Sequence, residues 1–116
     1  MRDKGNIGED IAAAFLESKG LIILERNYYT REGEIDIIAR DGEVIVFAEV
    51  KSRRDAKHAT AREAVSPSKQ RKLRKAAGYW LAKNYAETNE PPATFDVIEV
   101  YSSMTPPGVR RLRDAF

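Results

Sequence analysis

The segment that most constrains the fold is residues 33–53, GEIDIIARDGEVIVFAEVKSR, in which two apolar runs flank the dipeptide Asp41-Gly42. Both runs are rich in Ile and Val, and Asp-Gly between two such runs is a strong signal for a β-hairpin. We therefore expect two antiparallel strands joined by Asp41 and Gly42 as a two-residue loop. This register would place Asp36 opposite Phe47.

The two faces of the predicted hairpin differ in polarity, because side chains alternate along a strand. One face is wholly apolar and belongs in the core: Ile35, Ile37, Ala39, Val44, Val46, Ala48 and Val50. The other face is apolar near the turn, through Ile38, Ile45 and Phe47, and charged at its far end, through Glu34, Asp36, Glu49 and Lys51. A sheet that is apolar on both faces is covered on both sides. The four charges are therefore expected at the rim of a packed layer.

Helices are expected on both sides of the hairpin in the sequence. The first lies within residues 6–20, and its buried face is predicted to comprise Ile7, Ile11, Ala14, Phe15 and Ser18. The second lies within residues 66–89, with Ser66 or Ser68 as its cap and a stripe of Leu73, Ala76, Ala77, Trp80 and Leu81.

Strands are expected at residues 21–29 and 94–101, whereas residues 103–116 are predicted to form a C-terminal tail with little regular structure. The order helix, strand, hairpin, helix, strand is typical of an α/β fold with a mixed sheet between helices. We therefore expect a three-layer sandwich, formed by a single domain whose core spans about residues 5–102.

Length and composition exclude several classes of protein. A chain of 116 residues fits one compact domain, and the absence of Cys excludes disulfides and thiolate metal sites. There is no apolar run of the roughly 20 residues that a membrane span requires, and the first residues, MRDKGNIGED, lack the apolar stretch of a signal peptide. We expect a cytoplasmic protein without a membrane partner.

The net charge of +2 hides an asymmetry along the chain. Residues 1–50 carry 6 Lys and Arg against 11 Asp and Glu, whereas residues 51–116 carry 14 against 7. An acidic half can hold a cation and a basic half can bind a polyanion, although blocks of charge are also common on solvated surfaces.

The charged end of the hairpin has the chemistry of a metal site. Asp36 and Glu49 would be diagonal neighbours about 7 Å apart at Cα, close enough for both carboxylates to reach one cation. Oxygen ligands favour Mg²⁺ or Mn²⁺, which complete their shells with water and substrate phosphate. Lys51 could orient or deprotonate a water, or stabilise negative charge. The alternative is a cross-strand cluster of salt bridges without catalytic function.

Asp36 followed by Glu49-Val50-Lys51 resembles the metal site of the PD-(D/E)xK nuclease superfamily, although Ile35 stands where the literal motif has Pro. Further segments resemble the YraN-like family of uncharacterised bacterial proteins: GEDIAAAFLESKG, NYYTREGEIDII, FAEVKSR, EAVSPSKQRKL and the final DAF. That family is similar to archaeal Holliday junction resolvases. The resemblance implies a restriction-endonuclease-like fold, cleavage of branched DNA and a homodimer.

The resemblance also implies roles for individual residues. Asp36 and Glu49 match the metal ligands, Lys51 matches the catalytic lysine, and Glu9 matches a helix glutamate that joins the metal site. Gln70 matches a polar residue on the following helix, where it either reaches a site water or the scissile phosphate or forms an ordinary core hydrogen bond. Without the resemblance, Glu9 would be read as an acid placed favourably in the first turn of a helix.

Basic residues near the predicted site are candidates for contacts with a nucleic-acid backbone: Arg53, Arg54, Lys69, Arg71, Lys72 and Lys75. A solvated helix face explains those of the second helix equally well, and the lone His58 is assigned to the surface. The sequence thus predicts a Mg²⁺- or Mn²⁺-dependent endonuclease that acts on branched or structured DNA. The alternatives are a non-catalytic nucleic-acid-binding adaptor domain and a purely structural interaction protein.

Overall fold

The strands of this protein form one mixed sheet, seen in a computed structural model that describes residues 6–53 and 65–116. The elements in chain order are α1 (Ile7–Ser18), β1 (Ile22–Thr30), β2 (Gly33–Asp41), β3 (Val44–Ser52), α3 (Pro67–Asn84), the 3₁₀ helix η1 (Glu87–Asn89), β4 (Ala93–Tyr101) and β5 (Gly108–Leu112). The predicted order is confirmed, and β5 is an addition to it. Among the described residues, no helix is both long and apolar enough to cross a membrane.

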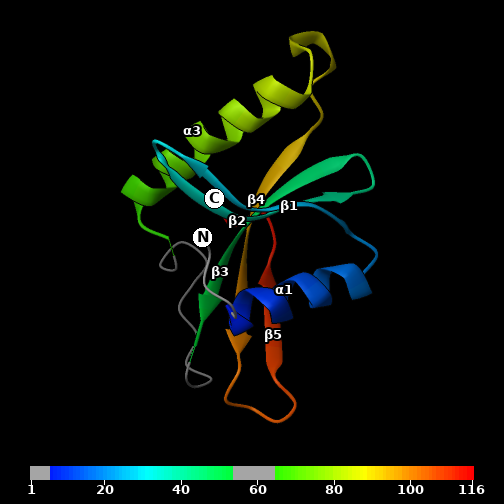
Figure 1. The fold of residues 1–116 in the computed structure, drawn as a ribbon, viewed down its shortest axis with the longest axis vertical. Helices are drawn as coiled ribbons and strands as arrows, with labels where there is room; N and C mark the ends of the chain where they lie inside the picture. Colours follow the sequence, from blue (N-terminus) through cyan, green and yellow to red (C-terminus); the bar gives the residue numbers. More distant parts are fainter. Residues whose placement is uncertain (1–5, 54–64) are drawn as a thin grey trace.

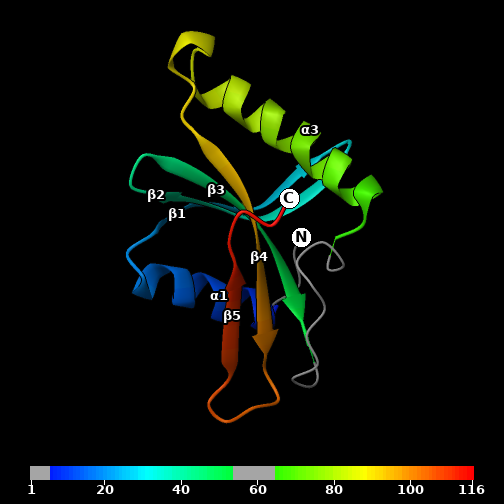
Figure 2. The ribbon, with the colours of Figure 1, turned by 180° about the vertical axis from the view of Figure 1, so that it is seen from behind.

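The sheet has the strand order β1-β2-β3-β4-β5. Three neighbouring pairs are antiparallel, and β3 and β4 are parallel, because the chain between them passes through α3. Figure 1 shows the twisted sheet at the centre, with α3 across the upper part of the view and α1 across the lower part. Figure 2 gives the reverse view, in which β4 and β5 again run side by side.

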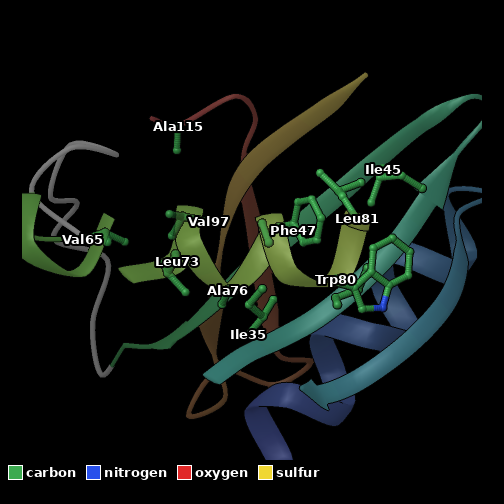
Figure 3. Packing of buried hydrophobic residues seen from close by; sticks show 12 residues of the cluster. Ile35, Ile45, Phe47, Val65, Leu73, Ala76, Trp80, Leu81, Val97 and Ala115 are labelled. Atoms are coloured by element: carbon green, nitrogen blue, oxygen red, sulfur yellow. The ribbon is translucent and has the colours of Figure 1, made fainter. Parts of the chain in front are cut away.

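Two apolar clusters cover the two faces of the sheet, so the predicted three-layer sandwich is confirmed. Figure 3 shows the cluster under α3, in which Leu73, Ala76 and Trp80 of the helix face Phe47 of β3. The indole of Trp80 meets the ring of Phe47 edge-on, with centroids 5.9 Å apart. The five predicted residues of the helix stripe are its buried residues, and Ser66 caps it by accepting the amide of Lys69.

The cluster on the opposite face lies under α1 and corrects the predicted orientation of that helix. Its buried residues are Gly8, Glu9, Ala12, Ala13 and Leu16, whereas Ile7 is 65% exposed and Ala14 is also exposed. The predicted face is therefore wrong at Ile7, Ala14 and Ser18, whereas Ile11 and Phe15 do pack against the cluster. Small side chains allow the helix to approach the sheet closely, and Glu9 enters the interface because polar groups on β1 bind it, as described below.

The β2–β3 hairpin is present, but its register differs from the prediction. Asp41 pairs with Val44 and Ile37 pairs with Ala48, so the loop residues are Gly42 and Glu43. Gly42 has a φ of 61° at the first loop position, where a type II′ turn favours glycine. The shift of two positions leaves the side chains of the paired residues, 37–41 and 44–48, on their predicted faces. If this register is continued by one pair beyond Ile37 and Ala48, Asp36 lies opposite Glu49 instead of Phe47.

Alternation in β2 is interrupted at the charged end of the hairpin. Ile35, predicted for the wholly apolar face, packs in the cluster under α3 instead. The β2–β3 pairing runs only as far as Ile37 and Ala48, and beyond it the Val50 amide donates to the Asp36 carboxylate at 2.8 Å. A side chain therefore replaces a backbone carbonyl as the acceptor, which frees the two strands from strict alternation.

The predicted irregular tail is wrong, because residues 108–112 form β5 against β4. Beyond β5, the Ala115 amide donates to the Phe95 carbonyl at 2.6 Å, and the ring of Phe116 stacks on Phe95 with centroids 5.2 Å apart. The Arg74 guanidinium of α3 covers Phe95, 4.9 Å from its centroid. The last residues therefore close the cluster under α3, and the packed region extends beyond residue 102.

Candidate functional site

Asp36 and Glu49 form a carboxyl pair where β2 and β3 separate. Glu49 is only 4% exposed, and the Asp36 carboxyl accepts the Val50 amide while hydrogen-bonding to Glu49. Burial raises the pKa of Asp36 to about 7, the charges of Glu49 and Glu34 and the hydrogen bond to Glu49 add to the rise, and the Val50 amide opposes it. Burial and the neighbouring negative charges therefore disfavour the ionised form of Asp36.

Two lysines contact the Glu49 carboxylate. The Lys69 ammonium lies 2.5 Å from Glu49 Oε2, and the Lys51 ammonium lies 3.6 Å from the same oxygen. Burial lowers the pKa of Lys69, but the hydrogen bond to Glu49 and the charges of Glu49, Asp36 and Glu34 outweigh it, so the pKa is raised. Sequence reasoning assigned Lys69 only to a nucleic-acid surface. Its place in the first turn of α3, directly after the Ser66 cap, is the signal that could have located it here.

Glu9 is connected to this pair through β1 and Glu34. Its buried carboxylate accepts hydrogen bonds from Arg26 Nε at 3.1 Å and from Asn27 Nδ2 at 2.9 Å. Asn27 Nδ2 also donates to Glu34 Oε2 at 2.7 Å, and the negative charge of Glu34 in turn helps to raise the pKa of Asp36. Asn27 has a φ of 53°, a conformation that Asn tolerates better than most residues. A single amide thus bridges two carboxylates and links α1 to the site.

A pocket of about 360 Å³ opens beside the carboxyl pair, between β2 and the start of α3. Its polar lining includes Glu34, Asp36, Ser66, Ser68, Lys69 and Lys72. An adjoining hollow of about 210 Å³ is lined by Glu32 and Ser68 together with three basic residues, Arg71, Lys72 and Lys75. The basic residues predicted on α3 therefore flank the acidic pair, an arrangement that favours a phosphate group near the carboxylates.

The other predicted site residues lie away from the pair or outside the description. The Gln70 side chain donates to the Val65 carbonyl at 2.9 Å and lines a different hollow with Pro67, Arg74 and Phe116. Of the two roles expected for Gln70, the structure therefore shows the ordinary hydrogen bond within the packed protein. Arg53 Nε donates to Glu99 Oε2 at 3.1 Å. Arg54 and His58 lie outside the described residues.

Two further acids are buried on β4, and the sequence reasoning missed both. Asp96 is 1% exposed and accepts the Arg111 side chain at 2.8 Å and the Asp114 amide at 2.9 Å. Glu99 is fully buried and accepts Arg53, Arg110 and the Tyr101 hydroxyl. The available signal was the acids within TFDVIEVY and the later Arg-Arg pair, which β5 brings alongside them.

The donor set fits a hard divalent cation in part. Within residues 6–53 and 65–116, no group of three or more His, Cys, Asp or Glu side chains is arranged to hold a metal ion. Glu9, Asp36 and Glu49 thus do not form a ready three-carboxylate site in the described chain. Mg²⁺, however, is commonly held by one or two carboxylates together with water and substrate phosphate. Asp36 and Glu49, adjacent and repelling each other, fit that smaller donor set.

Comparison with known proteins agrees with the predicted YraN-like resemblance. The model of an uncharacterised protein family, UPF0102, matches residues 8–100. A UPF0102 protein of Syntrophus aciditrophicus is 47% identical over 114 residues, covering 97% of this chain and 87% of the relative. A UPF0102 protein of Symbiobacterium thermophilum is 48% identical, and the alignment covers 85% of this chain and 82% of the relative. A UPF0102 protein of Clostridioides difficile is 47% identical, and the alignment covers 86% of each chain.

Proposed function

This chain belongs to the uncharacterised protein family UPF0102, and from the chemistry of its acidic pocket we propose that it is a metal-dependent endonuclease acting on branched or structured DNA. The observation that carries the proposal is the Asp36–Glu49 pair, in which Lys51 contacts Glu49 and Asp36 lines an open pocket edged by Lys69 and Lys72. Perturbed carboxyl groups in a cleft are more common at functional sites than elsewhere.

In this proposal, Asp36 and Glu49 hold Mg²⁺ or Mn²⁺, and Val50 fixes the Asp36 carboxylate through its amide. The bound cation would polarise a phosphoryl oxygen and lower the pKa of a water. Lys51 would orient that water, deprotonate it if its own amine has first lost a proton, or stabilise the charge that develops on the phosphate. Glu9 serves as a positioning residue, because Asn27 ties it to Glu34 rather than to the pair directly.

The substrate binds across the pocket and the adjoining basic hollow. Lys72 lines both, and Arg71 and Lys75 extend the positive surface along α3. Such residues neutralise backbone phosphates without reading the bases, which suits recognition of DNA by its shape. Symmetric cleavage of two strands at a branch needs two sites, so the active form in this proposal is a homodimer.

A non-catalytic adaptor that binds nucleic acid is the second candidate. It is favoured by Glu49 already having two lysine partners, because a carboxylate so neutralised resembles a structural ion-pair cluster. It predicts binding of DNA without cleavage and without dependence on Mg²⁺.

The test is cleavage of end-labelled four-way junction, flap, single-stranded and duplex DNA with Mg²⁺, Mn²⁺ or chelator. Asp36→Ala and Lys51→Ala are compared with Lys83→Ala, an exposed lysine near the far end of α3. Metal-dependent cleavage that is lost in the first two variants and kept in the third supports the nuclease. DNA binding without cleavage by folded protein supports the adaptor, and absence of binding leaves the carboxylates as structural ion pairs.

A further inference from the structure

Lys69 lies where the positive charge of a bound metal would be needed. Its ammonium contacts Glu49 Oε2 at 2.5 Å and interacts with the charges of Asp36 and Glu34 as well. The negative charges of Asp36, Glu49 and Glu34 therefore all attract the Lys69 ammonium. Together with Lys51, Lys69 compensates part of the negative charge that β2 and β3 bring together.

A divalent cation and the Lys69 ammonium are poorly compatible on the same carboxylate. A metal held at about 2.1 Å from Glu49 would lie within about 5 Å of an ammonium hydrogen-bonded to the same oxygen, and the two positive charges repel. Glu49 is nearly buried, so water screens this repulsion less than at the surface. One of the two cations has to move.

Lys69 is the cation that can move, whereas Lys51 is held on a strand. The Lys69 side chain is 46% exposed and belongs to the first turn of α3, while the Lys51 side chain is 29% exposed and belongs to β3. The pocket beside Lys69 provides space, and Lys72 lies three positions later on the same side of the helix and lines that pocket. A displaced Lys69 would join Lys72 there.

We propose that Lys69 is an internal counter-ion that a divalent metal displaces from Glu49, and that displacement turns its ammonium into the pocket as a ligand for a backbone phosphate. This inference rests on the proposed metal site. It makes binding of metal and of phosphodiester mutually supporting, because the metal releases the lysine that the phosphate uses, and a phosphate bound to Lys69 keeps Glu49 available.

The test is calorimetric titration of the metal-free protein with Mn²⁺, without DNA, for the wild type, Lys69→Gln and Lys72→Gln. Both variants remove one positive charge from the same pocket, but only Lys69 contacts Glu49. We expect Lys69→Gln to bind Mn²⁺ about tenfold more tightly than Lys72→Gln, since only that variant removes a competitor. Thermal unfolding verifies that each variant is folded.

A second measurement follows the lysine itself. The rate at which acetic anhydride acetylates Lys69, read by mass spectrometry, should rise at least about threefold when Mg²⁺ is added, because a side chain displaced from Glu49 into the open pocket is more accessible to the reagent. The rate at Lys83 serves as the reference within the same sample.

The displacement would be refuted, but not the metal site, by either of two results. One is equal Mn²⁺ affinity of Lys69→Gln and Lys72→Gln, and the other is an acetylation rate at Lys69 that does not change when Mg²⁺ is added. Absence of Mn²⁺ binding in the wild type and in Lys69→Gln alike would overturn the metal site and the displacement together. Binding by Lys69→Gln in the absence of measurable binding by the wild type would support both.

Discussion

Replacement of Asp36 by Asn should stabilise the protein at alkaline pH. The Asn side chain has the size of a protonated Asp and can still accept the Val50 amide, so it removes the charge and keeps the hydrogen bond. In the folded protein the ionised Asp36 is buried beside Glu49 and Glu34, whereas in the unfolded chain it lies in water. The substitution therefore relieves a repulsion that exists only in the folded state.

The magnitude follows from the pKa, which rises from 3.8 to about 7 on folding. Because the folded protein binds this proton more tightly than the unfolded chain, Asp36 costs stability as pH rises above about 4, and the full cost is reached above about pH 7. At about 1.4 kcal/mol for each pKa unit, the upper bound is about 4 kcal/mol. Relaxation and water around a partly exposed group reduce it, and we expect about 2 kcal/mol at pH 8.

The assay is urea unfolding of the wild type and Asp36→Asn at several values between about pH 4 and pH 8. The difference in unfolding free energy should be close to zero at the acid end and should grow through neutrality, whereas the exposed control Glu87→Gln should show no such trend. Millimolar Mg²⁺ should stabilise the wild type at pH 8 and leave Asp36→Asn unchanged. A variant no more stable than the wild type at pH 8 would refute the reasoning.

The buried ion pair and the basic surface give two further predictions. Arg111→Met should destabilise the protein by about 3 kcal/mol in urea unfolding, because it leaves Asp96 buried without its cation, whereas Arg113→Met, at an exposed pair, should cost less than about 1 kcal/mol; equal losses would contradict this. In fluorescence anisotropy with labelled DNA, the double variant Lys72→Gln and Lys75→Gln should lower the slope of log affinity against log salt by about two. An unchanged slope would place the DNA elsewhere.

Strong periodicity in the sequence was sufficient for some elements and not for others. The stripe from Leu73 to Leu81 was predicted in full, because large apolar residues at helical spacing leave one orientation for α3. In α1, the true interface contains Glu9 and alanines, and a hydrophobicity pattern cannot tell a buried carboxylate from an exposed one. The side chains of Arg26 and Asn27, on another element, bind Glu9 inside the interface.

The site was predicted by residue type and missed in part by geometry. Asp36, Glu49 and Lys51 are adjacent in the structure, because a register shift of two positions keeps the alternation of β3 and brings Asp36 beside Glu49. Lys69 joined them only through the packing of α3 on the sheet, a long-range contact that no local pattern reports. The prediction of an irregular tail failed for a related reason. Arg110 and Arg111 of β5 reach Glu99 and Asp96 only when β4 lies beside β5.

The parallel pairing of β3 with β4 also determines how the chain must fold. Strands β1, β2 and β3 are joined by short turns and can associate early, but the far edge of β3 receives its partner only after α3 and the chain around it are in place. Until then that edge could pair with another molecule. Glu49 and Lys51 charge this strand, and charged residues on an open edge discourage such pairing. We therefore expect Glu49 and Lys51, residues of the proposed active centre, to reduce aggregation during folding, before β4 has paired with β3.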